Sequence, residues 1–204
     1  MRVNRPALAL SSAAAALLVF VAGARAESTD TIGTVTAVHR EVNVTHAAQM
    51  DVASVSLGTS VLFQDLYQTK DFSRVKLLFE DDSILTLGER TSLKITENIY
   101  NPAKGQRSTV VDVAQGSVRA LVGKLFGGPG SKFEIRSPTA AAAAHGTYFI
   151  VWTTGEGNRL ITGVLNIGES GTVGVRNIDA TVPGSVDLGQ NDYKIGRASC
   201  RERV

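Results

Sequence analysis

The stretch that decides the fold covers residues 135–151 and reads I-R-S-P-T-A-A-A-A-A-H-G-T-Y-F-I-V. Within it, the dipeptide Ser137-Pro138 breaks the chain, five alanines follow, and Gly146 leads into an apolar run. Five alanines are far fewer than the ~12 residues that an isolated helix needs, and a proline and a glycine bound them. We therefore expect an extended or single-turn segment, in a place where only small side chains fit.

Short alternating segments surround this stretch on both sides. Runs rich in β-branched and aromatic residues are typical of strands, and they occur at 42–45, 75–79, 93–96, 118–122, 147–152 and 159–164. Turn-forming residues separate them at 80–83, 101–105, 127–130, 155–158, 168–171 and 183–184. The predicted fold class is all-β, a single domain of many short strands, either a β-helix-like stack or a twisted β-sandwich.

The segment 147–152 has two distinct faces. Phe149 and Val151 are expected to face the core, which leaves Tyr148, Ile150 and Trp152 together on the other side. We expect that side to be a second buried face. The alternative is an aromatic platform for a partner strand or a sugar.

The two ends differ in composition from the rest. Residues 1–26 combine a basic start, an apolar run and an Ala-Arg-Ala site, which predicts a cleaved signal peptide, with an uncleaved membrane anchor as the alternative. The arginine-rich residues 194–204 resemble a translated sequencing adapter, so we interpret them as an artefact. The domain is then expected at 27–178, with 179–193 as the start of a truncated C-terminal region.

Charge and cysteine content exclude several classes of function. The whole sequence has a net charge of +2, but without the two ends 14 basic and 18 acidic side chains remain, a net of −4. This argues against nucleic acid and against anionic membrane surfaces as partners. The single cysteine, Cys200, lies in the suspected artefact. The domain itself therefore has no disulfide framework and no thiolate for catalysis.

Several motifs in order along the chain resemble the FecR family. The 135–151 stretch matches its Ser/Thr-Pro break, small-residue run and Gly-Thr-x-Phe step, although His145 stands where the family usually has arginine. Upstream, the family turn at 58–69 has Gln64 in place of glycine, and the acidic turn at 80–83 has Asp82 in place of glycine. A glycine step at 113–119 and a closing hairpin at 164–173 complete a resemblance that spans roughly 33–177.

The resemblance implies a structural role for most of the motif residues. Gly146 is expected to occupy a backbone turn that a Cβ would strain, and His145 is expected to cap carbonyls or pair with an acid, with pH sensing as an alternative. The full set of motif residues is Asp65, Thr69, Asp81, Ser83, Gly116, Pro138, His145, Gly146, Thr147, Phe149 and Gly168.

No pattern in the sequence predicts catalysis, a cofactor or a metal site. The three histidines are not at metal-ligand spacing, and the acids at 80–82 lack the spacing of a calcium loop, so we expect solvated turn residues there. The glycines at 127–130 lack the ending of a phosphate loop. The chain is therefore predicted not to be an enzyme.

The resemblance also implies a compartment and a kind of function. Known FecR domains lie in the periplasm behind a cytoplasmic anti-sigma segment, which the six residues before the apolar run cannot provide. We expect a stand-alone, periplasmic or secreted interaction or sensing module. An envelope protein is its expected partner, docked at a strand edge near 148–152 or 168–175. A glycan-binding envelope module and a fragment of a larger signalling protein are the alternatives.

Overall fold

The computed structural model describes residues 31–48, 50–123, 131–179 and 181–197. The predicted signal peptide and residues 198–204 of the suspected artefact lie outside the described residues. The described chain folds into sixteen strands and two short 3₁₀ helices, η1 (Pro102–Lys104) and η2 (Gly157–Arg159), so the all-β prediction is confirmed. None of its helices is long and apolar enough to span a membrane.

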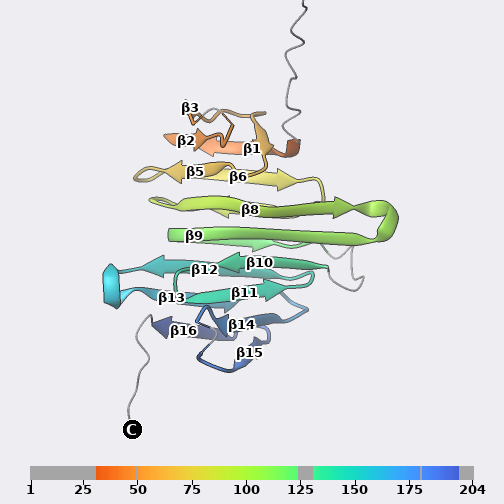
Figure 1. Ribbon diagram of the computed structural model, residues 1–204, viewed down its shortest axis with the longest axis vertical. Helices are drawn as coiled ribbons and strands as arrows, with labels where there is room; N and C mark the ends of the chain where they lie inside the picture. Colours follow the sequence, from red (N-terminus) through yellow and green to blue (C-terminus); the bar gives the residue numbers. More distant parts are fainter. Residues whose placement is uncertain (1–30, 49, 124–130, 180, 198–204) are drawn as a thin grey trace, which may run out of the picture.

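The strands form two layers that face each other, and within each layer the strands follow one another along the long axis of the molecule (Figure 1). In order across the layer, sheet A contains β4 (Ser60–Leu62), β1 (Thr31–His39), β6 (Arg74–Phe79), β7 (Ile84–Leu87), β9 (Gln106–Leu121), β12 (Tyr148–Thr154), β13 (Ile161–Asn166) and β16 (Tyr193–Arg197). Sheet B contains β3 (Val52–Ser54), β2 (Val42–Thr45), β5 (Leu66–Thr69), β8 (Ser92–Asn101), β9 again, β10 (Lys132–Arg136), β11 (Ala140–Ala144), β14 (Val173–Asn177) and β15 (Ser185–Leu188).

Strand β9 belongs to both layers. Its residues 106–115 pair with β8 and its residues 108–112 pair with β10, both in sheet B, whereas its residues 116–121 pair with β7 and β12 in sheet A. Gly116, with φ of 90°, lies where the strand passes from one sheet to the other. One long strand therefore joins the two layers into a single hydrogen-bonded network.

One core lies between the two layers. Side chains alternate along the strands, so β6 directs Val75, Leu77 and Phe79 inward while β8 directs Leu93 and Ile95 inward from the facing sheet. Among the described strands only β9 and β10 pair in parallel, whereas a β-helix stacks parallel strands throughout. The twisted sandwich is therefore the better of the two predicted architectures.

The alanine run is extended, as expected. It forms β11, which pairs with β10 on one side and β14 on the other. Ala140, Ala142 and Ala144 belong to the core cluster, and Ala141 is almost fully covered as well. Small side chains on both faces suit a strand this deeply enclosed.

The predicted docking edges are not edges. The segment 148–152 lies in β12, between β9 and β13, and the 168–175 hairpin leads into β14, between β11 and β15. That prediction is wrong because each sheet continues past the recognisable motifs to a further strand. The outermost strands are β3, β4, β15 and β16, and β16 includes residues 194–197, the first part of the suspected artefact.

Candidate functional site

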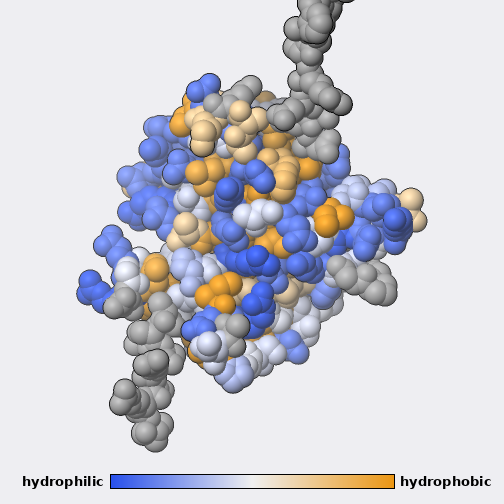
Figure 2. Space-filling model, in the orientation of Figure 1, coloured by the Kyte–Doolittle hydropathy of each residue, from blue (hydrophilic) through white to orange (hydrophobic). Residues whose placement is uncertain are grey.

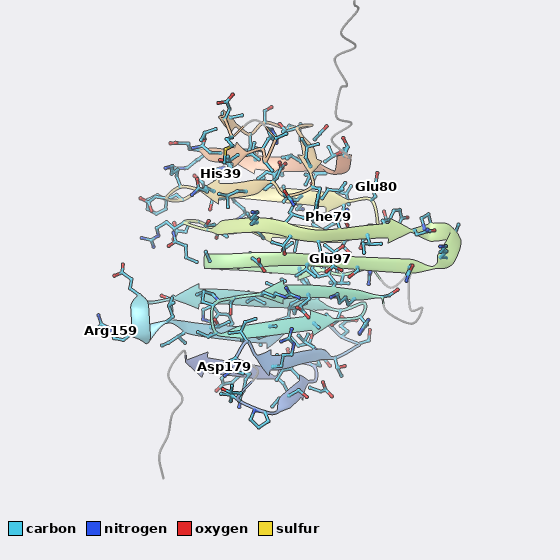
Figure 3. The ribbon with its side chains drawn as sticks, in the orientation of Figure 1. His39, Phe79, Glu80, Glu97, Arg159 and Asp179 are labelled. Carbon is cyan, nitrogen blue, oxygen red and sulfur yellow. The ribbon has the colours of Figure 1, made fainter. Side chains whose placement is uncertain are left out.

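One acid of the turn between β6 and β7 is buried, which corrects the prediction that all three are solvated. Glu80, labelled in Figure 3, and Asp82 are exposed, as expected for turn residues. Asp81, however, is 3% exposed and accepts hydrogen bonds from the Ser83 backbone N–H and hydroxyl, both at 3.0 Å. Asp82 has φ of 61°, so it occupies the left-handed conformation for which the family uses glycine.

The partner that keeps Asp81 buried is Arg107, which the sequence analysis missed. This side chain is 1% exposed, and its Nη1 donates to Asp81 Oδ2 at 3.2 Å and to the Gly123 carbonyl at 2.9 Å. The ion pair links the β6–β7 hairpin to the start of β9. The hydrogen bond to Gly123 adds the short segment that follows the end of β9. A lone arginine at the start of a predicted strand carries no local signal of such a pair, because its partner is 26 residues away.

Asp65 organises the turn that precedes β5. Its carboxylate accepts from the Leu62 N–H at 2.9 Å and contacts His46 Nδ1 at 2.7 Å and the Tyr67 hydroxyl at 3.4 Å. Burial, together with the charge and hydrogen bond of Asp65, raises the pKa of Tyr67, so the phenol stays neutral. Thr69 continues this support by donating to the Gly88 carbonyl at 2.6 Å.

The remaining motif residues also support the fold. Gly146 has φ of 73°, in agreement with the predicted turn. Thr147 donates to Asn166 Oδ1 at 3.0 Å, and Gly168 packs so closely on Thr147 that a Cβ would lie 2.1 Å from its hydroxyl. Phe149 is fully buried in the core. Pro138 differs from these residues, because it is exposed at the rim of a groove.

His145 does not take the role expected for it. Its side chain is exposed and makes no hydrogen bond or ion pair with any described residue. It lies in the turn between β11 and β12. Apart from His145 and Pro138, the motif residues are buried or half-buried, so exposed surfaces have to be built mainly from other residues.

The outer side of sheet A carries a broad apolar surface, which we call the apolar face. Pairing brings its members together across neighbouring strands: Leu78 lies beside Ile84, Ile84 beside Leu121, and Leu121 beside Tyr148. Most are half-exposed, and Leu121 is 45% exposed. The apolar face is defined by Leu78, Ile84, Leu121, Tyr148, Ile150, Trp152 and Leu165.

Two aromatic side chains of the apolar face have fixed positions. The Trp152 indole lies over Gly163, where a Cβ would come within 2.0 Å of the ring. The Arg119 guanidinium lies over the Tyr148 ring, 5.1 Å from its centroid. The face predicted to be a second buried layer is therefore partly open to solvent, and the alternative of an aromatic platform fits it better.

Charges on the apolar face have one sign. Within β6, β7, β12, β13 and the sheet A part of β9, the outward-facing charged side chains are Arg74, Lys76 and Arg119, all of them basic, whereas the exposed acids Glu80 and Asp82 lie beyond the strands in the β6–β7 turn. A sparse set of cations around an apolar surface favours a partner that is apolar at its centre and acidic at its rim.

The outer side of sheet B has a different chemistry. Hydrophilic side chains cover much of the view in Figure 2, with apolar ones between them. At its centre Arg136 Nε and Arg176 Nη2 both donate to Glu134 Oε1, at 2.5 Å and 3.2 Å. Burial alone raises the pKa of Glu134, but the hydrogen bonds and charges of the two arginines outweigh it and bring the pKa below its usual value.

A groove crosses this side of sheet B beside the Glu134 cluster. Its volume is about 410 Å³. It is lined by both apolar and charged side chains: Leu66, Ser92, Lys94, Asp112, Val113, Ala114, Arg136, Ser137, Pro138 and Ile178. Among the described residues, no cluster of three histidine, cysteine or carboxylate side chains could hold a metal ion.

Comparison with known proteins places the scaffold in a family. A family model described as FecR protein matches residues 65–166, half of the chain. This chain belongs to the FecR family. The match begins at Asp65 and ends at Asn166, so it contains the Asp65 turn, the Arg107–Asp81 pair and all of β9.

Two crystal structures of a proposed anti-sigma factor from Parabacteroides distasonis are similar to the FecR chain. Each has 17% sequence identity, with TM-scores of 0.49 and 0.48. The alignment covers 64% of this chain and 53% of the other, so the chain spans about half the length of these proteins. No curated protein matches the chain in sequence.

Proposed function

We propose that this FecR chain is a non-catalytic interaction and sensing module of the bacterial cell envelope, and that it docks a protein partner on the apolar face of sheet A. The apolar face carries the proposal. Contiguous exposed apolar surface is costly in water, and on soluble proteins it marks interaction sites. Membership of the FecR family supports a signalling role and an envelope location.

The chemistry of the face describes the partner. Tyr148, Trp152 and Arg119 are of the residue types that contribute most to protein interfaces. Because the charged side chains on the face are basic, the partner surface is expected to surround an apolar centre with aspartate and glutamate. Such complementary charge speeds association and makes it sensitive to salt.

A glycan-binding module is the second candidate function, and one observation favours it. The Trp152 indole lies over Gly163 and is partly exposed, and an exposed indole can stack on a sugar ring. Aliphatic side chains such as Leu78, Ile84 and Leu121 also lie on the face, and they favour a protein surface over a polar sugar.

The proposal is tested by immobilising the chain and measuring which protein it retains from an envelope extract. We expect Leu121→Ser and Arg119→Glu each to release a protein that the unchanged chain retains, because both residues are exposed on the apolar face. Gln68→Glu is the matched control, since Gln68 is exposed on β5 in sheet B. Retention that survives both substitutions on the apolar face would overturn the docking proposal.

Two further measurements separate the alternatives. Binding to a glycan array that disappears in Trp152→Ala would replace the protein partner with a sugar. Turnover of glycosides or peptides by the purified chain would contradict the non-catalytic part of the proposal.

A further inference from the structure

The groove on the outer side of sheet B has the features of a small-ligand site. Its volume of about 410 Å³ falls within the ~300–1,000 Å³ that is usual for such sites. It lies on the opposite side of the sandwich from the apolar face, so it is independent of the proposed docking function.

Three charges line the groove in a fixed order. Lys94 on β8 pairs in register with Asp112 on β9, and Asp112 pairs with Arg136 on β10. Neighbouring strands lie about 4.8 Å apart, so a carboxylate stands between two cations along one row of the sheet. The register of the parallel β9–β10 pair sets this order, because a shift by one residue would place Arg136 on the other face.

Two of these charges make no direct side-chain contact of their own, although the charge of Asp112 acts on the neighbouring Arg136. The side chains of Asp112 and Lys94 form no hydrogen bond or ion pair with any residue in the described part of the chain. Arg136 is different, because its Nε is bound to Glu134. Asp112 is half-buried, and its carboxylate oxygens are not among the buried atoms without a partner, so they stay open to solvent and within reach of a ligand ammonium.

The walls of the groove are mainly apolar. Leu66, Ala114, Pro138 and Ile178 lie around the row of charges, and Ile178 is 38% exposed. Pro138 comes from the Ser-Pro break of the family motif, and its fixed backbone gives that wall a defined shape. Pro138 contributes nothing to the core, and its place in the wall of the groove explains why it is exposed.

We propose that the groove binds a short zwitterionic peptide. Its free amino group lies on Asp112, its carboxylate lies on Lys94, and an apolar side chain packs against Pro138 and Ile178. The ends of an extended dipeptide are ~7 Å apart at most, a separation that flexible side chains on adjacent strands can meet.

Calorimetric titration with the dipeptide Ala-Leu tests the proposal. We expect a dissociation constant of about 1 mM or tighter for the free dipeptide. N-acetylation removes the ammonium and C-terminal amidation removes the carboxylate, so each is expected to weaken binding by about 10-fold or more. Absence of binding by the free dipeptide, or equal binding of all three forms, would overturn the proposal.

Variants of the groove locate the binding. We expect Asp112→Asn and Lys94→Gln each to weaken binding of Ala-Leu by about 10-fold. Lys94 is exposed, so its variant keeps the test valid even where Asp112→Asn disturbs folding. Lys104→Gln, at the exposed η1 and outside both the groove and the apolar face, should bind as the unchanged chain does. Unchanged binding by Lys94→Gln would place the dipeptide elsewhere and refute the assignment.

Discussion

Replacement of Gly116 by alanine should reveal how strongly the fold depends on the passage of β9 between the two sheets. Gly116 has φ of 90°, which costs an L-residue about 1–2 kcal/mol. A Cβ there would lie 2.5 Å from Thr91 Cα and 2.8 Å from the Arg90 carbonyl oxygen, both backbone atoms. Crowding of that kind adds about 1–3 kcal/mol, so we expect a total loss of about 2–5 kcal/mol.

The contribution of crowding can be separated from that of backbone strain. Gly58 has φ of 83°, but a Cβ there would meet nothing within 4 Å. Gly58→Ala therefore carries the strain alone, about 1–2 kcal/mol. Urea titration of both variants measures the difference, and for a chain of this size each kcal/mol lowers the melting temperature by about 2–4 °C. Equal losses in the two variants would refute the tight passage at Gly116.

Three other predictions concern single side chains. Gln64→Gly should raise the free energy of unfolding by up to about 1 kcal/mol, because Gln64 is exposed and has φ of 66°; a lower urea midpoint would contradict this. Arg107→Leu should lower the free energy of unfolding by about 3–5 kcal/mol, because it leaves Asp81 buried without its cation. Arg159 on exposed η2 (Figure 3) is the control, and Arg159→Leu should change stability little in the same urea titration. Because the pKa of Glu134 is lowered in the fold, its stabilising effect is present above about pH 4.3 and disappears as the pH falls through the folded pKa. Urea midpoints measured from pH 7 downward should therefore fall more steeply for the unchanged chain than for Glu134→Gln.

Features governed by short stretches of chain were predictable. Alternation of apolar and polar residues predicted β2 with its observed bounds. It also predicted β6, β12 and β13 with starts within two residues of those observed. Asp82 stands where the family turn has glycine, and its φ of 61° is the left-handed backbone that a glycine position suggests. Each of these features depends on the conformational preferences of a few neighbouring residues.

Features governed by long-range pairing were not predictable. Asp81 was expected to be solvated because a run of acids at a turn usually is, and only the fold brings Arg107 to it. The strand edges were misplaced because no local pattern shows that β15 and β16 extend the two sheets. Likewise, Leu78 and Leu165 look like ordinary strand residues until pairing places both on the apolar face.

Local sequence patterns were therefore sufficient for the all-β class, for six of the sixteen strands and for the family. The tertiary structure decided the remainder: the sandwich architecture, the crossing of β9 at Gly116, the buried Arg107–Asp81 pair and the two chemically different outer faces. The physical reason is that a strand specifies which of its side chains share a face, whereas its neighbours are chosen by packing and register over the whole chain. The apolar face, which five strands build together, exists only after that choice.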